Sequence, residues 1–375
     1  MKRFLAVFLM LAILLTGLTV TASAASPWAK DADGNWTYTK ADGKLAEDEW
    51  IKDGGKWYYF IGTLMAENEV FTDGKNWYAA DKTGAMVSNG WFQEKFDDYS
   101  EWYYAGADGA LIKGWKQIGG KWYFFDDWAG SELKYKPWMA SGSIWTVNNT
   151  KYAFKPSGEM IVGWGQPFLG SQWYDQTDVD NVTNWVYANA DGSLAIGWKK
   201  IDGKWYYFWK DGTMARNVVV WFNKGDSKYD AYGFNKSGAM IENGWFMDPD
   251  TEGGTEDWYY FGADGLSKKG WLKDKGKWYY LDADFGIMYH YGFELMSDGK
   301  TYYLDPTTGA MATGWKQIDD VWYFFKDSGA RAEKEWVKSG SAWYYLKEEG
   351  EMAKDEILTI DGKPYKFDAN GVWVP

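Results

Sequence analysis

Residues 197–208 read Gly-Trp-Lys-Lys-Ile-Asp-Gly-Lys-Trp-Tyr-Tyr-Phe, and this stretch decides the fold. Aromatic strand-forming residues stand at both ends, and the Asp-Gly pair between them is a strong signal for a two-residue hairpin turn. The stretch therefore predicts a β-hairpin. Its first strand begins with Gly-Trp, and its second strand contains Trp-Tyr-Tyr-Phe.

The same hairpin pattern recurs along the chain. Gly-Trp occurs seven times, at Trp91, Trp115, Trp164, Trp198, Trp245, Trp271 and Trp315. One short hairpin is at best marginally stable in water, whereas stacked neighbours can share a continuous core. We therefore predict an all-β fold, a β-hairpin solenoid of about 14–15 repeats of about 20–26 residues, which occupies residues 25–375.

The second strand of each hairpin has four positions, which in the quoted stretch are Trp205, Tyr206, Tyr207 and Phe208. Position two is almost always Tyr and position four is mostly Phe or Leu. Since alternate residues of a strand share a face, positions two and four are predicted to form the core. Position one varies and is predicted to face outward. Every third hairpin lacks Trp there, which suggests roughly three hairpins per superhelical turn; the replacements are Lys151, Ala231, Thr301 and Pro364.

Composition excludes several functions. The 375 residues include 28 Trp, 28 Tyr and 20 Phe but no Cys and a single His. A disulfide framework, a thiolate zinc site and a cysteine nucleophile are therefore excluded, and we expect no metal site and no cofactor. The formal net charge of −13 also makes nucleic acid a poor candidate partner, because basic patches supply the affinity for phosphate backbones.

Residues 1–24 have the pattern of a secretory signal peptide. Lys2 and Arg3 precede an apolar run, and a small-residue cleavage site follows at residues 22–24. The apolar run is short for a membrane span, and no later segment is longer. We therefore expect a secreted protein that does not span the membrane and that begins near Ala25.

The exposed Trp residues predict a ligand site. The first-strand Trp and the position-one Trp are seven residues apart in several hairpins, for example Trp315 and Trp322. Such a spacing fixes the separation of the two indoles, and a ring from the next hairpin would complete an aromatic cage. A cage of this kind binds a quaternary ammonium group through cation–π attraction, each contact contributing about 0.5–2 kcal/mol.

The repeats resemble the choline-binding, or cell-wall-binding, repeats of Gram-positive bacteria, most clearly at residues 197–208 and 313–325. The resemblance implies a hairpin solenoid that holds choline or phosphocholine of teichoic acids between repeats, with two Trp from one repeat and an aromatic from the next. Carried over by position, it predicts these ligand-binding residues: Trp245, Trp258 and Tyr280; Trp271, Trp278 and Tyr303; Trp315, Trp322 and Tyr345; Trp91, Trp102 and Trp122.

The same reasoning predicts that some cages lack a third wall. The hairpins after Trp115/Trp122 and Trp198/Trp205 offer Lys151/Ala153 and Ala231/Gly233, and the hairpin after Trp336/Trp343 offers Pro364/Lys366.

Three functions remain open at this level. The repeats also look like the glucan-binding repeats of glucansucrases, so the rings could stack on sugars, and a structural or adhesive protein could use every Trp in its core. We expect no enzyme and no catalytic residue, because the acidic pairs lie in predicted turns and His290 has no catalytic partner pattern. The leading hypothesis is a protein held at the cell wall or cell surface by choline-recognising cages.

Overall fold

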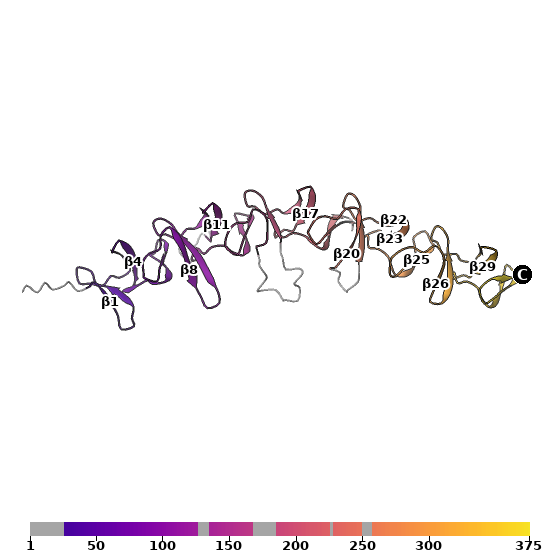
Figure 1. The fold of residues 1–375 in the computed structure, drawn as a ribbon, viewed down its shortest axis with the longest axis horizontal. Coiled ribbons are helices and arrows are strands. Elements are labelled where there is room, and N and C mark those ends of the chain that lie inside the picture. The colour runs from indigo at the N-terminus through magenta and orange to yellow at the C-terminus, as the bar shows by residue number, and fades with distance from the viewer. Residues whose placement is uncertain (1–25, 127–134, 168–184, 226–227, 250–256) are drawn as a thin grey trace, which may run out of the picture. The chain divides into compact units, whose positions relative to one another are not determined.

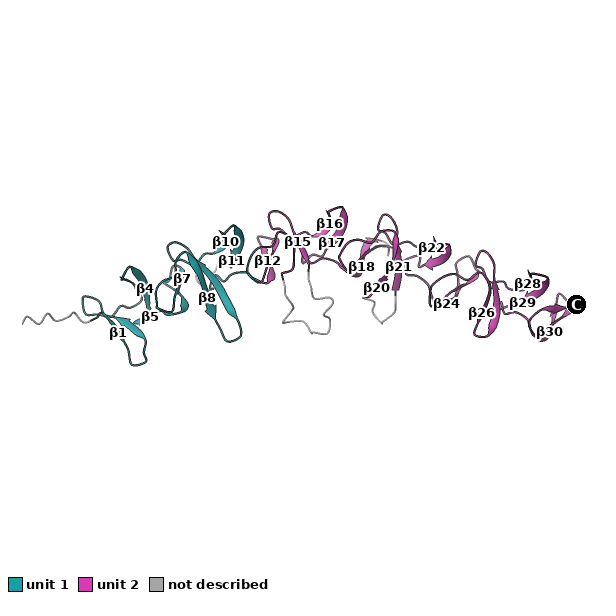
Figure 2. Ribbon diagram, viewed as in Figure 1, with its two compact units in different colours: residues 1–141, 157–160 teal, residues 142–156, 161–375 magenta. Residues whose placement is uncertain are grey.

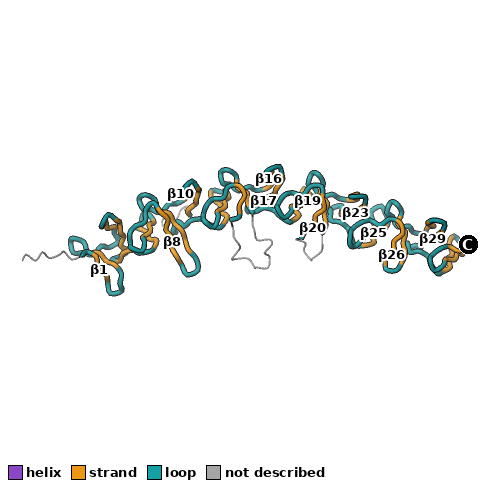
Figure 3. Tube along the Cα trace, viewed as in Figure 1, coloured by secondary structure: helices purple, strands orange, loops and turns teal. Residues whose placement is uncertain are grey.

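A computed structural model describes residues 26–126, 135–167, 185–225, 228–249 and 257–375 (Figure 1). The predicted signal peptide, residues 1–24, lies outside these ranges. All the regular elements of the described residues are strands, joined by turns and loops (Figure 3). This part of the chain contains no helix long and apolar enough to cross a membrane. The predicted all-β chain of hairpin repeats is therefore confirmed.

The chain divides into two compact units, which Figure 2 distinguishes by colour. The first unit comprises residues 1–141 and 157–160. Its described strands pair as antiparallel hairpins, with β5 as a third strand beside β4. They are β1 (Trp28–Lys30), β2 (Trp36–Tyr38), β3 (Trp50–Asp53), β4 (Lys56–Ile61), β5 (Leu64–Met65), β6 (Glu69–Thr72), β7 (Trp77–Ala80), β8 (Gly90–Lys95), β9 (Ser100–Ala105), β10 (Gly114–Ile118) and β11 (Lys121–Phe125).

The second unit comprises residues 142–156 and 161–375. Its described strands also pair as antiparallel hairpins, with β32 added beside β31. They are β12 (Ser143–Val147), β13 (Thr150–Phe154), β14 (Gly163–Gly165), β15 (Val186–Ala188), β16 (Gly197–Ile201), β17 (Lys204–Phe208), β18 (Val218–Gly225), β19 (Lys228–Phe234), β20 (Gly244–Asp248), β21 (Asp257–Phe261), β22 (Gly270–Asp274), β23 (Lys277–Leu281), β24 (Gly292–Leu295), β25 (Thr301–Leu304), β26 (Gly314–Ile318), β27 (Val321–Phe325), β28 (Glu335–Ser339), β29 (Ala342–Leu346), β30 (Glu356–Ile360), β31 (Lys363–Phe367) and β32 (Trp373–Val374).

The hairpin β16–β17 shows why the sequence folds in this way. Asp202 and Gly203 connect its strands with φ angles of 47° and 81°. Two successive left-handed residues form the turn that matches the right-handed twist of a hairpin, and Asp-Gly adopts it readily. The turn fixes the register, which pairs Trp198 with Tyr207 and Lys200 with Trp205.

A backbone hydrogen bond links many of the connectors to the hairpin one repeat further back. Met240 follows β18–β19 and donates its N–H to the carbonyl oxygen of Trp205 in β17, over 2.8 Å. Met86 and Trp57 form the same bond in the first unit, also over 2.8 Å. Successive hairpins are therefore joined by backbone as well as by side-chain packing, and this bond brings the connector residue beneath the preceding hairpin's position-one residue.

Position four is the centre of the core. Phe60, Phe208, Phe234, Phe325 and Leu346 have no exposed surface. This part of the predicted core is confirmed. Position two differs, because several of its tyrosines are only partly buried. Positions two and four do share a face, as the alternation predicts. The position-four side chain is buried, whereas the position-two ring reaches the surface.

Candidate functional site

Two indoles from the same hairpin stand at right angles to each other. In β16–β17 the ring centroids of Trp198 and Trp205 are 6.3 Å apart and the ring planes meet at 86°. Trp198 is 36% exposed and Trp205 is 39% exposed, so neither ring is a core residue. Six other pairs have centroid separations of 6.3–6.4 Å and interplanar angles of 79–89°: Trp28/Trp36, Trp50/Trp57, Trp91/Trp102, Trp115/Trp122, Trp164/Trp185 and Trp315/Trp322.

The third wall comes from the next hairpin and is its position-two Tyr. Tyr232 lies 4.8 Å from Trp198 between centroids, edge to face at 73°. The equivalent distances are 4.8–5.1 Å for Trp50–Tyr78, Trp91–Tyr123, Trp164–Tyr206, Trp245–Tyr279, Trp271–Tyr302, Trp315–Tyr344 and Trp336–Tyr365. Burial raises the pKa of Tyr232 above its ordinary value, so this wall is a neutral phenol at physiological pH.

The fourth side is a Met from the connector. Trp198, Trp205, Tyr232, Met240 and Asp264 line a cavity of about 220 Å³. We call the space between one hairpin and the next an inter-repeat site, and we call it a cage where aromatic rings wall it. The methionine thioether suits such a surface, because it is polarizable and packs well against aromatic rings.

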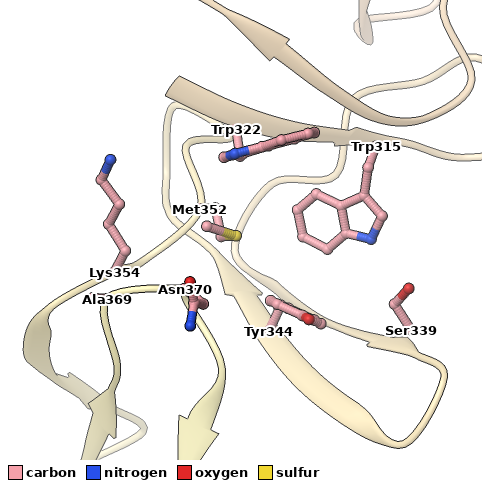
Figure 4. Close-up of a pocket in the computed structure, with 8 residues that line it drawn as sticks. All are labelled: Trp315, Trp322, Ser339, Tyr344, Met352, Lys354, Ala369 and Asn370. Carbon is pink, nitrogen blue, oxygen red and sulfur yellow. The ribbon is translucent and has the colours of Figure 1, made fainter. Parts of the chain in front are cut away.

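Two further cages have the same four walls, two Trp, a Tyr and a Met. Trp50, Trp57, Tyr78, Met86 and Asp108 line the one that follows β3–β4. Trp315, Trp322, Tyr344 and Met352 wall a wider pocket in the second unit, whose rim carries Ser339, Lys354, Ala369 and Asn370 (Figure 4). Figure 4 shows the two indoles and the Tyr344 ring around a common space, with Met352 at its back.

The structure corrects the predicted third walls. Tyr280 contacts Trp271, the first-strand Trp of its own hairpin, and Tyr303 contacts Phe293 in the same way. Tyr345 contacts Trp336. Trp122 pairs with Trp115 of its own hairpin. These residues stand at positions one and three, which face the hairpin's own first strand or its own cage. The rings beside Trp245, Trp271, Trp315 and Trp91 are instead Tyr279, Tyr302, Tyr344 and Tyr123.

This correction also changes two sites that were expected to lack a wall. Tyr232 completes the cage of Trp198 and Trp205, although its neighbours Ala231 and Gly233 carry no ring. Trp336, Trp343 and Tyr365 form a pocket with Trp373, which takes the place of the connector Met. The constancy of Tyr at position two was the sequence signal for the third wall, because a cage wall constrains a residue as strongly as a core does.

Two of the four predicted Trp pairs lie together in the structure. Trp91 lies against Trp102, and Trp315 lies against Trp322. Trp258 and Trp278 accept the connector hydrogen bonds from Met288 and Met311, each over 2.8 Å. They therefore have the backbone setting of Trp205 and Trp322. The first-strand indole of the Trp245 site is held by its Nε1–H, which donates to Asp274 over 3.0 Å.

Four inter-repeat sites in the described residues lack the first-strand Trp. Ile144, Val70 and Val219 take its place in three of them and pack in hydrophobic clusters. Val70 and Val219 are only 5% and 6% exposed. In the fourth, Phe293 takes this place. These four sites recur at every third hairpin, the interval that the position-one replacements predicted.

The described residues thus form an all-β repeat protein of stacked hairpins with a recurring aromatic cage. The model of the choline-binding repeat matches residues 195–245, 255–293 and 333–373. A second model, described as a cell wall binding repeat, matches residues 48–60, 113–128 and 313–330. The resemblance to this family is therefore confirmed over the matched residues.

A curated relative of this chain is a much longer protein. Glucosyltransferase-S of Streptococcus mutans is 28% identical over 332 residues, which cover 83% of this chain and 21% of that protein. The chain thus spans about a fifth of this relative's length.

Solved structures with related sequences include two from Streptococcus pneumoniae. The structure of CbpJ is 25% identical, with a TM-score of 0.34, over 87% of this chain and 99% of CbpJ. The choline-binding domain of CbpL is 29% identical, with a TM-score of 0.34, over 48% of this chain and 98% of that domain.

Proposed function

We propose that this chain is a secreted, non-catalytic cell-wall-binding protein. Its cages hold the trimethylammonium groups of choline-substituted teichoic acid and attach it noncovalently to the cell surface. The observation that carries the proposal is the cage geometry. Two indoles at about 86° and a phenol 4.8 Å from the first form a box that matches a compact cation from several sides.

Charge supports a cationic ligand. The rims of the Trp198 and Trp50 cages each carry a carboxylate, Asp264 and Asp108. The chain as a whole has a formal net charge of −13. One cage gains a few kcal/mol before the entropy of binding is subtracted, so we expect a dissociation constant on the order of millimolar. A polymer with many choline groups would be retained through several cages at once.

Glucan binding is the second candidate, and the match to a glucosyltransferase over 83% of this chain favours it. A sugar ring stacks best on a flat, open aromatic face. The right angle between Trp198 and Trp205 leaves no shared flat surface, whereas it does enclose a small cation. We therefore rank choline first.

A titration separates the two candidates. The chain is titrated with choline chloride and, separately, with a glucan oligosaccharide, and intrinsic Trp fluorescence and the melting temperature are followed. We expect saturable quenching and a higher melting temperature with choline alone. A response to the oligosaccharide alone would favour the glucan candidate, and no response to either would contradict both.

A site variant assigns the response to the cage. The ε-methyl resonance of Met352, which lines the Trp315 cage, should shift with choline in the native chain and lose this response in Trp322→Ala. Leu295→Ala is the matched control, because Leu295 is 74% exposed and lines none of the described cages. A Trp322→Ala variant that is folded and still responds at Met352 would argue against the cage as the binding site.

A further inference from the structure

The inter-repeat site that follows β24–β25 retains part of a cage. Phe293 pairs with Tyr303 as Trp271 pairs with Tyr280, so Phe293 holds the place of the first-strand Trp. Tyr323 of the next hairpin lies 4.9 Å from Phe293, edge to face at 62°. Two aromatic walls are therefore present in their usual geometry. Only the position-one wall is missing, because Thr301 stands there.

Arg331 takes the place of the connector Met in this site. Its N–H donates to the carbonyl oxygen of Thr301 over 2.7 Å, as the N–H of Met352 does to that of Trp322 over 2.8 Å. A Cβ on Gly350 would meet the Arg331 side chain, just as a Cβ on Gly371 would meet Met352. The backbone thus directs the side chain of residue 331 into the same space that Met352 occupies in its own cage.

The guanidinium group of Arg331 lies against the remaining rings. Its central carbon is 5.3 Å from the centroid of Phe293, within the range of a cation–π contact. The side chain is only 12% exposed. A planar cation therefore lies against the aromatic rings from the place that Met352 holds in its own cage.

Two carboxylates neutralise this cation. Nη2 of Arg331 is 2.8 Å from Glu333 and 4.0 Å from Glu349. Glu349 precedes Gly350 as Asp264 precedes Gly265, so it has the sequence position of the carboxylate on the rim of the Trp198 cage. The site therefore combines a cage's rings, a cage's acidic rim and a cation supplied by the chain itself.

The site around Val219 shows that an inter-repeat site can close in another way. There the first-strand and position-one residues are Val219 and Ala231, both buried, and they pack against Tyr259 and Phe261 of the next hairpin. Phe293, by contrast, keeps an aromatic ring at the first-strand position. A first-strand ring is not needed to close such a site, so its retention beside Arg331 points to a cage with an occupant.

We propose that Arg331 is an internal ligand that closes a latent quaternary-ammonium site between β24–β25 and β26–β27. This inference rests on the proposed choline function of the other cages. Replacing Arg331 with the usual Met removes the cation from beside the Phe293 ring, and restoring Trp at position one completes the walls.

The test uses the full chain with ¹³C-labelled methionine methyl groups and choline chloride as the probe. Arg331→Met places a methyl reporter inside the site itself. We expect the added methyl resonance to shift on titration with choline. In the double variant Thr301→Trp/Arg331→Met the same resonance should shift at a choline concentration at least fivefold lower. In Thr301→Trp alone, where Arg331 remains, the added indole N–H should not respond.

Native methionines in the same samples serve as controls. Met240 and Met352 line cages of the native chain and report choline binding there. If they shift and the added methyl of the folded double variant does not, the inference is overturned and the proposed function stands. A choline response of the indole N–H in Thr301→Trp also overturns it, because Arg331 then does not close the site. If Met240 and Met352 do not respond, the proposed function fails and the inference fails with it.

Discussion

Two consecutive inter-repeat sites of the second unit share a backbone and differ in their side chains. The first is walled by Trp198, Trp205 and Tyr232, with Met240 behind them. The second has Val219, Ala231, Tyr259 and Ser267 at the corresponding positions. Their connector bonds are nearly the same, 2.8 Å from Met240 to Trp205 and 3.0 Å from Ser267 to Ala231.

The difference shows that the scaffold and the ligand site are specified separately. Position-four Phe and the connector bond are present in both sites, and they hold the hairpins together. The exposed Trp205 is present in one site, and the buried Ala231 replaces it in the other. A hairpin can therefore lose its cage without losing its fold, which allows open and closed sites to alternate along one chain.

The largest expected effect tests the shared scaffold. Phe234→Ala in the open site and Phe261→Ala in the closed one each remove a ring with no exposed surface. Each substitution should lower the unfolding free energy by about 3–5 kcal/mol, because it leaves a cavity that the stacked hairpins cannot fill. Urea unfolding measures both. Clearly different losses for the two variants would contradict a common scaffold.

The next effect is on binding in the open site. Trp205→Ala removes one wall and should weaken choline binding at this cage by tenfold or more, as read from the Met240 methyl resonance, because a desolvated cation–π contact contributes up to about 2 kcal/mol. Trp209→Ala is the matched control, since Trp209 is also 39% exposed but does not line the cage. Equal losses in the two variants would argue against a cage-specific role for Trp205.

Much of this comparison could be predicted from the sequence. The Asp-Gly turn and the alternating aromatics give the hairpins, and the replacements at Lys151, Ala231 and Thr301 mark the sites that lack a position-one Trp. These features are local, so they depend on turn geometry and strand alternation alone. The burial of Phe208 and the exposure of Trp205 follow from the same alternation.

The third wall could not be predicted in this way. Alternation places Tyr279 and Tyr280 on opposite faces but does not say which face meets the preceding hairpin. The connector hydrogen bond settles this, since it sets how one hairpin lies on the next, and it has no sequence signature beyond the Met. The contact of Arg331 with Phe293 depends on the same stacking.

A smaller effect distinguishes the cages from one another. The Trp198 cage has Asp264 at its rim, whereas the Trp315 cage has Asn370 in the equivalent position. Asp264→Asn should weaken choline binding at the first cage about two- to fivefold, and Asn370→Asp should strengthen it at the second by a similar factor. The effects are modest because the Asp264 side chain is exposed and solvent screens its charge.

Titration of both variants at low and high salt checks the charge effect. Met240 and Met352 methyl resonances report the two cages separately, so each serves as the other's control. The difference between variant and native chain should shrink at high salt. A change that persists unaltered at high salt would mean that the substitutions act through packing and not through charge.

The smallest effect concerns pH and again separates the two kinds of site. Burial raises the pKa of Tyr232 in the open cage, and burial also raises the pKa of Tyr259, which is only 2% exposed in the closed site. A phenol whose pKa is raised by folding contributes stability that is present below the unfolded value of about 10 and is lost as the pH rises above it. Choline affinity and the unfolding free energy should therefore stay constant from neutral pH to about pH 9, and the unfolding free energy should fall above about pH 10.

The order of ionisation follows from the difference in burial. With ¹³C-labelled tyrosine rings, the signal of Tyr232 should begin to titrate while the chain is still folded, because its site is open to solvent. The signal of Tyr259 should change only when the chain unfolds. Ionisation of Tyr259 in the folded chain together with Tyr232 would mean that solvent reaches both sites equally, and the distinction between an open cage and a closed site would then fail at this pair of hairpins.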